Sequence, residues 1–409
     1  MRMGGTGQRV VRGSPGEERI GWLVAPGLAL IAVTYGLARY AYGLFLPEMR
    51  EAFDLTPALL GVIGAGSYLG YCVAIVFALV WTSRTGPRWM AGAAGIVAVV
   101  GMAVVAFAPA AWVLAVGVLV AGSSTGLASP PMGEAVACSI RKRLQDRANA
   151  LINSGTSVGV ALSGPAALLM TGEWRIAWAA FAVAGLAVLL WNAAVMPRRT
   201  VADEGGREGG EDGDRSGEVF STISYLTGAP SRSVPLFVAA FGLGFSSAVY
   251  WTFSRELVAG GLGQTGSTLF WTVIGVSGLA GGAAGDLVGR FGLSVVLRGA
   301  LIVMAASIAM LAVAPGVLPL AYGSAALFGS TYILLSGVVL VWSVSVFRER
   351  PSAGLGAGFL LISVGQVAGS PVAGALAGAT SLPAAFFAFA VAAVLTAGIR
   401  PRPEDTHAS

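Results

Sequence analysis

Residues 20–46 read IGWLVAPGLALIAVTYGLARYAYGLFL, and every one of them is apolar, small or aromatic except Arg39. A membrane-spanning helix needs about 20 mostly apolar residues, so this stretch is long enough to cross a bilayer. A signal peptide would have a shorter apolar core than this one. The stretch therefore predicts a first transmembrane helix, with a permanent cation inside it whose purpose has to be explained.

The composition extends this prediction to the whole chain. Of its 409 residues, 56% are hydrophobic and only 11% are charged, whereas soluble proteins are about 25% charged. The net charge of +5 is spread over short loops, so we expect no nucleic-acid partner. The single histidine is His407, and Cys72 and Cys138 form no metal-binding or redox motif. We expect an all-α integral membrane protein that is not an enzyme and holds no metal or cofactor.

Charge-free stretches and their internal breaks predict twelve transmembrane helices. If the N-terminus is cytoplasmic, all but four of the 25 basic residues lie inside, namely all except Arg39, Arg50, Arg175 and Arg255. This asymmetry favours cytoplasmic termini. The expected helices span roughly 20–46, 56–82, 88–108, 111–139, 147–171, 174–196, 233–254, 265–288, 293–314, 317–346, 353–378 and 382–399.

The twelve helices divide into two halves joined by a polar linker. The linker is rich in Gly, Glu, Asp and Arg and lacks apolar periodicity, which is typical of disorder. The expected parts are an N-terminal tail (1–19), a six-helix bundle (20–197), a cytoplasmic linker (198–232), a second six-helix bundle (233–400) and a C-terminal tail (401–409).

The two halves also repeat each other in sequence. With an offset of 206 residues, Tyr35-Gly36-Leu37 aligns with Phe241-Gly242-Leu243, and Pro165 aligns with Pro371. One constant offset holds over six helices without a gap. Parallel six-helix repeats joined by a linker are typical of a secondary transporter.

Two loops carry a resemblance to a known family. Residues 83–88 read SRTGPR, and residues 289–292 repeat them as GRFG. Both resemble the cytoplasmic G-x-x-x-D-R-x-G-R/K loop of the major facilitator superfamily, although the acidic position is Ser83 or Gly289 here. The resemblance implies a monomeric transporter that works by alternating access. It also implies cytoplasmic gate loops, with these residues taking part: Arg84, Gly86, Arg88, Asp286, Arg290 and Gly292.

The resemblance also suggests a branch of the superfamily. Residues 36–55, GLARYAYGLFLPEMREAFDL, look like the first helix of cyanate- and nitroimidazole-type bacterial carriers and of monocarboxylate carriers. The fifth helix, with GTSVGVALSGP at 155–165, fits the glycine pattern of proton-coupled drug antiporters only in part. We therefore expect transport of a small organic or inorganic anion across the cytoplasmic (inner) membrane, with drug efflux as the alternative.

Arg39 is the main candidate for the substrate site. At helical spacing it shares a face with Tyr35 and Tyr42, whereas the repeat places Phe241, Phe245 and Ala248 at the matching positions of the second half. A cation in the middle of a membrane helix is costly, so Arg39 should face protein or water. One hypothesis is that its planar fork binds an anionic substrate, and the alternative is a structural role in bonding carbonyls or reaching the interface.

Other polar groups in the predicted helices are weaker candidates. Glu134 is a carboxylate well inside a predicted helix, where it could carry protons for coupling or contact a gate; both alternatives stay open. Gln366 and Asn153 are expected to join helices through hydrogen bonds. Ring faces and hydroxyls for the cavity could come from Tyr68, Tyr71, Tyr250, Trp251, Tyr332 and Ser336.

Overall fold

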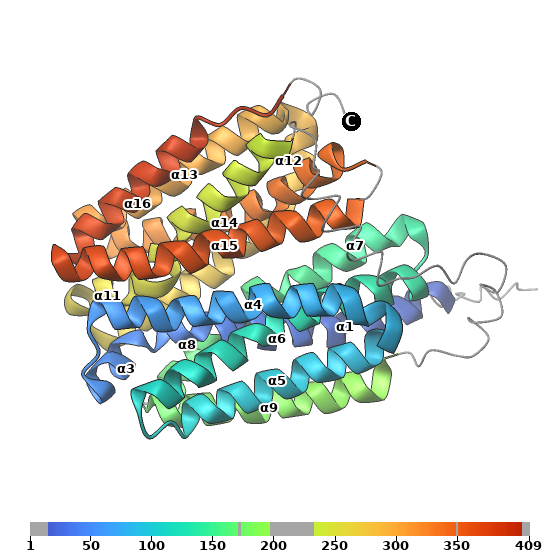
Figure 1. Ribbon diagram of the computed structural model, residues 1–409, viewed down its shortest axis with the longest axis horizontal. Coiled ribbons are helices and arrows are strands. Elements are labelled where there is room, and N and C mark those ends of the chain that lie inside the picture. The colour runs from blue at the N-terminus through green and yellow to red at the C-terminus, as the bar shows by residue number, and fades with distance from the viewer. Residues whose placement is uncertain (1–14, 171–172, 197–232, 349–350, 403–409) are drawn as a thin grey trace, which may run out of the picture.

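The computed structural model describes residues 15–170, 173–196, 233–348 and 351–402, and within these ranges all regular structure is helical. The expected linker at 198–232, nearly all of the N-terminal tail and most of the C-terminal tail lie outside the described residues. In Figure 1 the helices form an elongated bundle, with the N-terminal half below the C-terminal half.

The N-terminal half begins with a segment that changes helical type twice. It runs as α1 (Pro15–Ile31), a π-helix η1 (Ala32–Tyr40), α2 (Ala41–Leu44) and α3 (Leu46–Phe53). The remaining helices of this half are α4 (Pro57–Thr85), α5 (Pro87–Ala106), α6 (Ala111–Ser139), α7 (Lys142–Asn153), α8 (Gly155–Leu169) and α9 (Trp174–Val195).

The C-terminal half contains one very long helix and four others of ordinary length. Its elements are α11 (Val234–Gly278), η4 (Leu279–Ala283), α12 (Ala284–Phe291), α13 (Leu293–Val313), α14 (Leu318–Val346), α15 (Pro351–Ala379) and α16 (Leu382–Ala397). Helix α11 leaves helical geometry at Gly263, where φ is 66° and ψ is −177°.

These elements amount to the twelve predicted spans. Nine helical stretches within the described residues are long and apolar enough to cross a membrane. One of them, Val234–Phe291, is divided by the break at Gly263 and provides two spans. The shorter helices α8 and α16 provide the other two. The predicted twelve-helix membrane fold is confirmed.

The repeat is visible in the helix boundaries themselves. Helix α4 begins at Pro57 and ends at Thr85, and the offset of 206 carries these ends to Gly263 and Phe291. The glycines that follow adopt the same backbone conformation, with φ and ψ of 85° and 158° at Gly86 and 80° and 150° at Gly292. The two halves therefore turn identically after their second helices.

Both described ends of the chain lie at the same end of the bundle. In Figure 1 the start of α1 lies at the right and α16 runs from the left toward the upper right, whereas α3 lies at the opposite end. We call the end that holds α3 the outer end, because the predicted topology places it outside the membrane. Capping of α4 at this end is local: the Thr56 hydroxyl accepts a hydrogen bond from the Leu59 amide, and Pro57 follows it.

Glycines allow the two halves to approach closely where α4 meets α15 and where α8 meets α11. A Cβ atom placed at these positions would overlap atoms of the opposite half, so only glycine fits. The contacts are Gly61 with Ser370, Gly374 with Pro57, Gly275 with Ala161 and Gly164 with Thr272. They tie the second helix of each half to the fifth helix of the other.

The shared turn gives a test of the fold. Gly292 has a φ that other residues rarely adopt, and a Cβ there would meet no atom within 4 Å, so Gly292→Ala isolates the backbone penalty. We expect it to destabilise the protein by about 1–3 kcal/mol. Gly289→Ala is the control, because Gly289 is helical with open space around it and should gain up to about 1 kcal/mol. Thermal unfolding of the purified protein checks this, and equal effects of the two variants would contradict the assigned conformation.

Candidate substrate-binding site

The π-helix η1 presents Arg39 toward the other half of the protein. In a π-helix, backbone hydrogen bonds connect residues that are five apart. Tyr35 and Tyr40 therefore lie one turn apart in η1, whereas an α-helical turn would not bring residues at this spacing into line. The close approach of Gly36 to Gly159 of α8 holds this widened segment against its own bundle. Arg39 is only 5% exposed, so the guanidinium lies inside the protein.

The hydrogen bonds of Arg39 go to α15 of the opposite half. Its Nη2 donates to Oε1 of Gln366 at 2.9 Å and lies 3.4 Å from the hydroxyl of Ser363. Gln366 in turn donates from Nε2 to the Tyr332 hydroxyl at 3.2 Å, and that hydroxyl lies 3.3 Å from the hydroxyl of Tyr40. These four partners and Arg39 form one polar network that joins the two halves.

Aromatic rings surround the guanidinium. Its central carbon lies 4.6 Å from the ring centre of Tyr71 and 4.9 Å from that of Tyr68, both on α4. Tyr40 and Tyr35 are slightly farther away, at 5.5 Å and 5.7 Å. A cation within about 6 Å of a ring face is attracted by the ring quadrupole, so these tyrosines compensate part of the cost of burying the charge.

No carboxylate pairs with Arg39 among the described residues. The two ion pairs in this part of the chain are Arg50–Glu256 and Arg255–Glu48. The Nε atom of Arg39 is buried without a hydrogen-bond partner. Buried charges are normally paired, because an uncompensated one costs several kcal/mol, so a cation with only neutral partners is suited to receive an anion.

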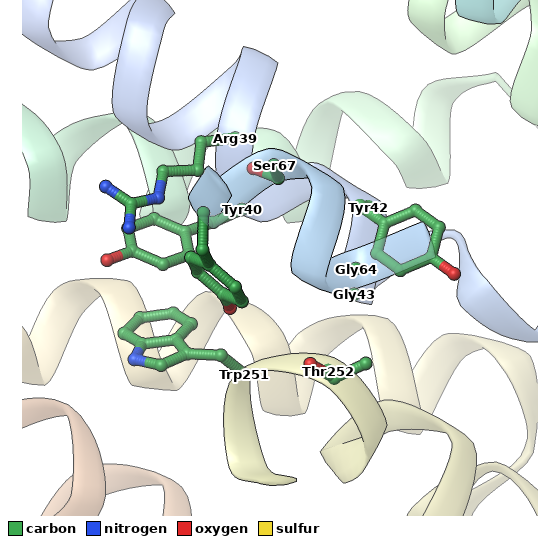
Figure 2. A pocket seen from close by; sticks show the side chains of 9 residues that line it. Arg39, Tyr40, Tyr42, Gly43, Gly64, Ser67, Trp251 and Thr252 are labelled. Carbon is green, nitrogen blue, oxygen red and sulfur yellow. The ribbon is translucent and has the colours of Figure 1, made fainter. Parts of the chain in front are cut away.

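A small cavity lies beside the guanidinium at the interface of the two halves. Its volume is about 10 Å³, roughly the space that one water molecule needs. Figure 2 shows Arg39 and Ser67 at the top, Tyr40 below Arg39, and Trp251 and Thr252 at the bottom. In this conformation the halves are closed on each other around the site.

The structure brings together only some of the residues predicted for the site. Trp251 stacks on Tyr40 with ring centres 4.0 Å apart, and Tyr332 belongs to the polar network. Tyr35 lies next to Arg39, and its hydroxyl is 2.8 Å from that of Ser129 on α6. Tyr68 and Tyr71, the weaker candidates, contribute the nearest rings.

Three predicted residues lie apart from the guanidinium. Tyr42 borders the cavity, but Figure 2 shows it away from Arg39, and its hydroxyl donates to the Leu60 carbonyl at 2.9 Å. Tyr250 is fully buried against Phe328 and lies 2.7 Å from the Ser324 hydroxyl. The Ser336 hydroxyl donates to the carbonyl of Tyr332 in its own helix.

Three residues of the site escaped the sequence analysis. Spacing for an α-helix selected Tyr42 and passed over Tyr40, because nothing in the sequence announces the π-helix. Gln366 was interpreted as a helix-joining residue, and Ser363 was not singled out. A glutamine three residues from a serine in an apolar helix was the available signal, and the structure buries both side chains.

Among the described residues, no ion pair joins the two expected cytoplasmic gate loops to each other. Arg88 donates to the carbonyl of Met196 at 2.9 Å, within its own half. Asp286 and Arg290 are both exposed, and neither has an ion-pair partner in the described ranges. Arg84 lies in the last turn of α4, and its side chain lies outside the described part. Glu134 is half-buried near the end of α6, and the hydrogen bonds of Arg39 go elsewhere.

Comparisons with solved structures place this site within a known fold. A mutant of the nucleoside transporter NupG superposes with a TM-score of 0.75 at 12% identity, covering 92% of this chain and 98% of that one. The xylose transporter XylE from E. coli, in a partially occluded inward-open conformation, gives 0.73 at 14% identity, with 94% and 97% covered. A bacterial homolog of the human lysosomal transporter Spinster, inward-facing and unoccupied, gives 0.70 at 13% identity, with 95% and 97% covered.

Sequence comparison identifies the family. No curated protein matches the chain. The model of the Major Facilitator Superfamily matches residues 28–360, which is most of the protein. At 12–14% identity the solved structures show the shared fold and leave the branch within the superfamily open. The chain belongs to the Major Facilitator Superfamily.

Proposed function

We propose that this protein is a secondary transporter of a small organic or inorganic anion, which binds to Arg39 between the two halves and crosses the membrane by alternating access. The fold supports transport by rocking of two bundles around a central site. The observation that carries the anion preference is the buried guanidinium, which has neutral hydrogen-bond partners and no carboxylate partner among the described residues.

An anionic substrate can exchange with the groups that now contact Arg39. The Gln366 carbonyl oxygen and the Ser363 hydroxyl are neutral acceptors, whereas a carboxylate or similar oxyanion is a charged one. A hydrogen bond from the guanidinium to an anionic oxygen adds a Coulomb attraction that a neutral acceptor lacks, and the planar fork of arginine binds two oxygens of one anion at once. Replacing neutral acceptors by an anion thus favours binding and releases α15 from the N-terminal half.

The asymmetry between the halves supports a substrate role for Arg39. The repeat position of Arg39 is Phe245, which stacks on Phe389 with ring centres 4.9 Å apart and lies among apolar side chains. A cation needed only to support the fold would be expected in both repeats. Its restriction to one half fits a group selected for a ligand.

The alternative of cationic drug efflux has less support. The rings around Arg39 could attract a cationic compound, but the guanidinium already occupies their faces. A second cation beside it would be repelled in a medium of low dielectric constant. The site therefore favours anions, and we place this multi-pass protein in the cytoplasmic membrane as a monomer.

Ligand stabilisation of the purified protein tests the role of Arg39. We expect one or more members of a panel of mono- and dicarboxylates and inorganic oxyanions to raise the melting temperature of the wild type. Arg39→Gln should abolish that shift, because it keeps a hydrogen-bonding side chain without the charge. Arg143→Gln, which removes an exposed arginine of α7, is the control and should retain it. Stabilisation by cationic drugs, or an anion effect that survives in Arg39→Gln, would contradict the proposal.

A second variant places a permanent anion beside Arg39. Gln366→Glu replaces the neutral acceptor of the 2.9 Å hydrogen bond by a carboxylate, so an internal ion pair competes with the substrate. We expect the ligand-free protein to melt about 2 °C higher and the anion-induced shift to disappear. Gln366→Leu, which removes the acceptor, should lower the melting temperature and leave anion binding in place. Loss of the anion effect in both variants would point to a disrupted fold instead.

Coupling to protons is proposed through Glu134, with a gate contact as the other role considered. With the anion identified above, uptake into vesicles is measured with and without an inward proton gradient. If Glu134 carries the proton, Glu134→Gln should abolish stimulation by the gradient while keeping exchange of the anion across the membrane. A variant that still responds to the gradient would assign Glu134 to the gate.

A further inference from the structure

Two helical segments run together from the Arg39 site to the outer end. One consists of residues 39–50, which continue from η1 through α2 into α3, and the other of residues 251–256 of α11. Tyr40 stacks on Trp251 at the inner end of this contact. One turn outward, a Cβ at Gly43 would overlap the Trp251 carbonyl, so the two backbones are as close as glycine permits. We call these two segments the outer seam.

Arg255 occupies the centre of the outer seam. Its side chain is 2% exposed, although it comes from the predicted outer end of a membrane helix. It donates to Oε2 of Glu48 at 2.6 Å and to the carbonyl of Leu44, and its Nη2 lies 3.3 Å from the Thr268 hydroxyl. The Leu44 carbonyl lies at the end of α2, where Phe45 leaves helical geometry. The guanidinium thus binds both the helix break and the acidic side chain that follows it.

A second ion pair lies farther along the outer seam, and in it the basic residue comes from the N-terminal half and the acidic residue from the C-terminal half. Arg50 of the N-terminal half pairs with Glu256 of the C-terminal half, and the two positions are related by the 206-residue repeat. Gln264 adds a hydrogen bond from the start of the next helix to Glu48. Each half therefore contributes one acidic and one basic residue to the two ion pairs.

The polar contacts between the two halves indicate that the protein is closed at the outer end. Seven hydrogen bonds, which include both ion pairs, join residues 39–50 of the N-terminal half to described residues of the C-terminal half. At the opposite end, Asp286 and Arg290 are exposed and have no ion pair in the described ranges. An approach to Arg39 from the outer end along this contact requires the outer seam to separate.

We propose that, in the alternating-access cycle proposed above, Arg255 is the residue that keeps the outer side closed, and that breaking its bonds to Glu48 and to the Leu44 carbonyl is the step that opens the outer seam. Closure replaces water on Arg255 by Glu48 and the Leu44 carbonyl, and opening returns these groups to water. The Arg255–Glu48 pair is the stronger of the two, because the Arg50 side chain is 43% exposed and surface ion pairs contribute little.

The gate is tested by the accessibility of the cavity from outside. Ser67 lines the cavity and is 2% exposed, so a cysteine there reports opening. In a background with Cys72→Ser and Cys138→Ser, Ser67→Cys is reacted with a membrane-impermeant maleimide added to whole cells. Elution as a single symmetric peak after purification confirms that each variant is folded. No substrate is needed, so the outcome does not depend on the role proposed for Arg39.

We expect Glu48→Gln and Arg255→Gln each to raise the labelling rate about tenfold, as the loss of a charge-assisted hydrogen bond made only in the closed state predicts. Arg50→Gln should change it by about twofold or less. Glu51→Gln, at an exposed carboxylate of α3 with no ion pair to a described residue, is the control and should leave it unchanged.

A double variant separates gating from general damage. If Glu48 and Arg255 act as one pair, combining Glu48→Gln with Arg255→Gln should raise the rate no further than either change alone. Arg255→Lys, which keeps the charge, should return the rate to within about threefold of the wild type. Unchanged labelling in the single variants, or multiplied effects in the double variant, would overturn the proposal.

Discussion

The desolvation of one guanidinium constrains the architecture around it. Arg39 lies in a membrane helix, away from water, and its charge has to be compensated by protein groups. The N-terminal half supplies the rings of four tyrosines, and the C-terminal half supplies the amide of Gln366 and the hydroxyl of Ser363. Because these compensating groups come from both halves, how well the charge is compensated depends on the distance between the halves. Separation removes acceptors from Arg39, and the proposed anionic substrate would replace them.

The fold could be predicted from the sequence because its determinants are local or periodic. Apolar length predicts the spans, basic loops predict their direction, and the offset of 206 predicts a repeat that the helix boundaries of α4 and the matching turns at Gly86 and Gly292 confirm. Arg39 was identifiable because a charge in an apolar helix has few structural explanations. The predicted break between the seventh and eighth helices is reduced in the structure to a single non-helical residue, Gly263.

The composition of the site could not be predicted because it depends on helix geometry and on packing between the halves. A π-helix changes which residues share a face, so Tyr40 rather than Tyr42 lies beside Arg39. Gln366 contacts a residue 327 positions away, and no pattern within one helix indicates such a partner. Arg255 was placed outside from the charge pattern alone, whereas the structure buries it and pairs it with Glu48 across the halves.

The two bundles share one backbone plan but differ in what they carry, since the cation stands on η1 and its repeat position holds the phenylalanine Phe245. An anion held by Arg39 stays attached to the N-terminal bundle for as long as it is bound. In the rocking movement proposed above, the C-terminal bundle changes its position relative to the bound anion, which is exposed first to one compartment and then to the other. The cation on one half thus makes two related bundles unequal in the proposed cycle: the N-terminal bundle binds the anion and the C-terminal bundle closes over it.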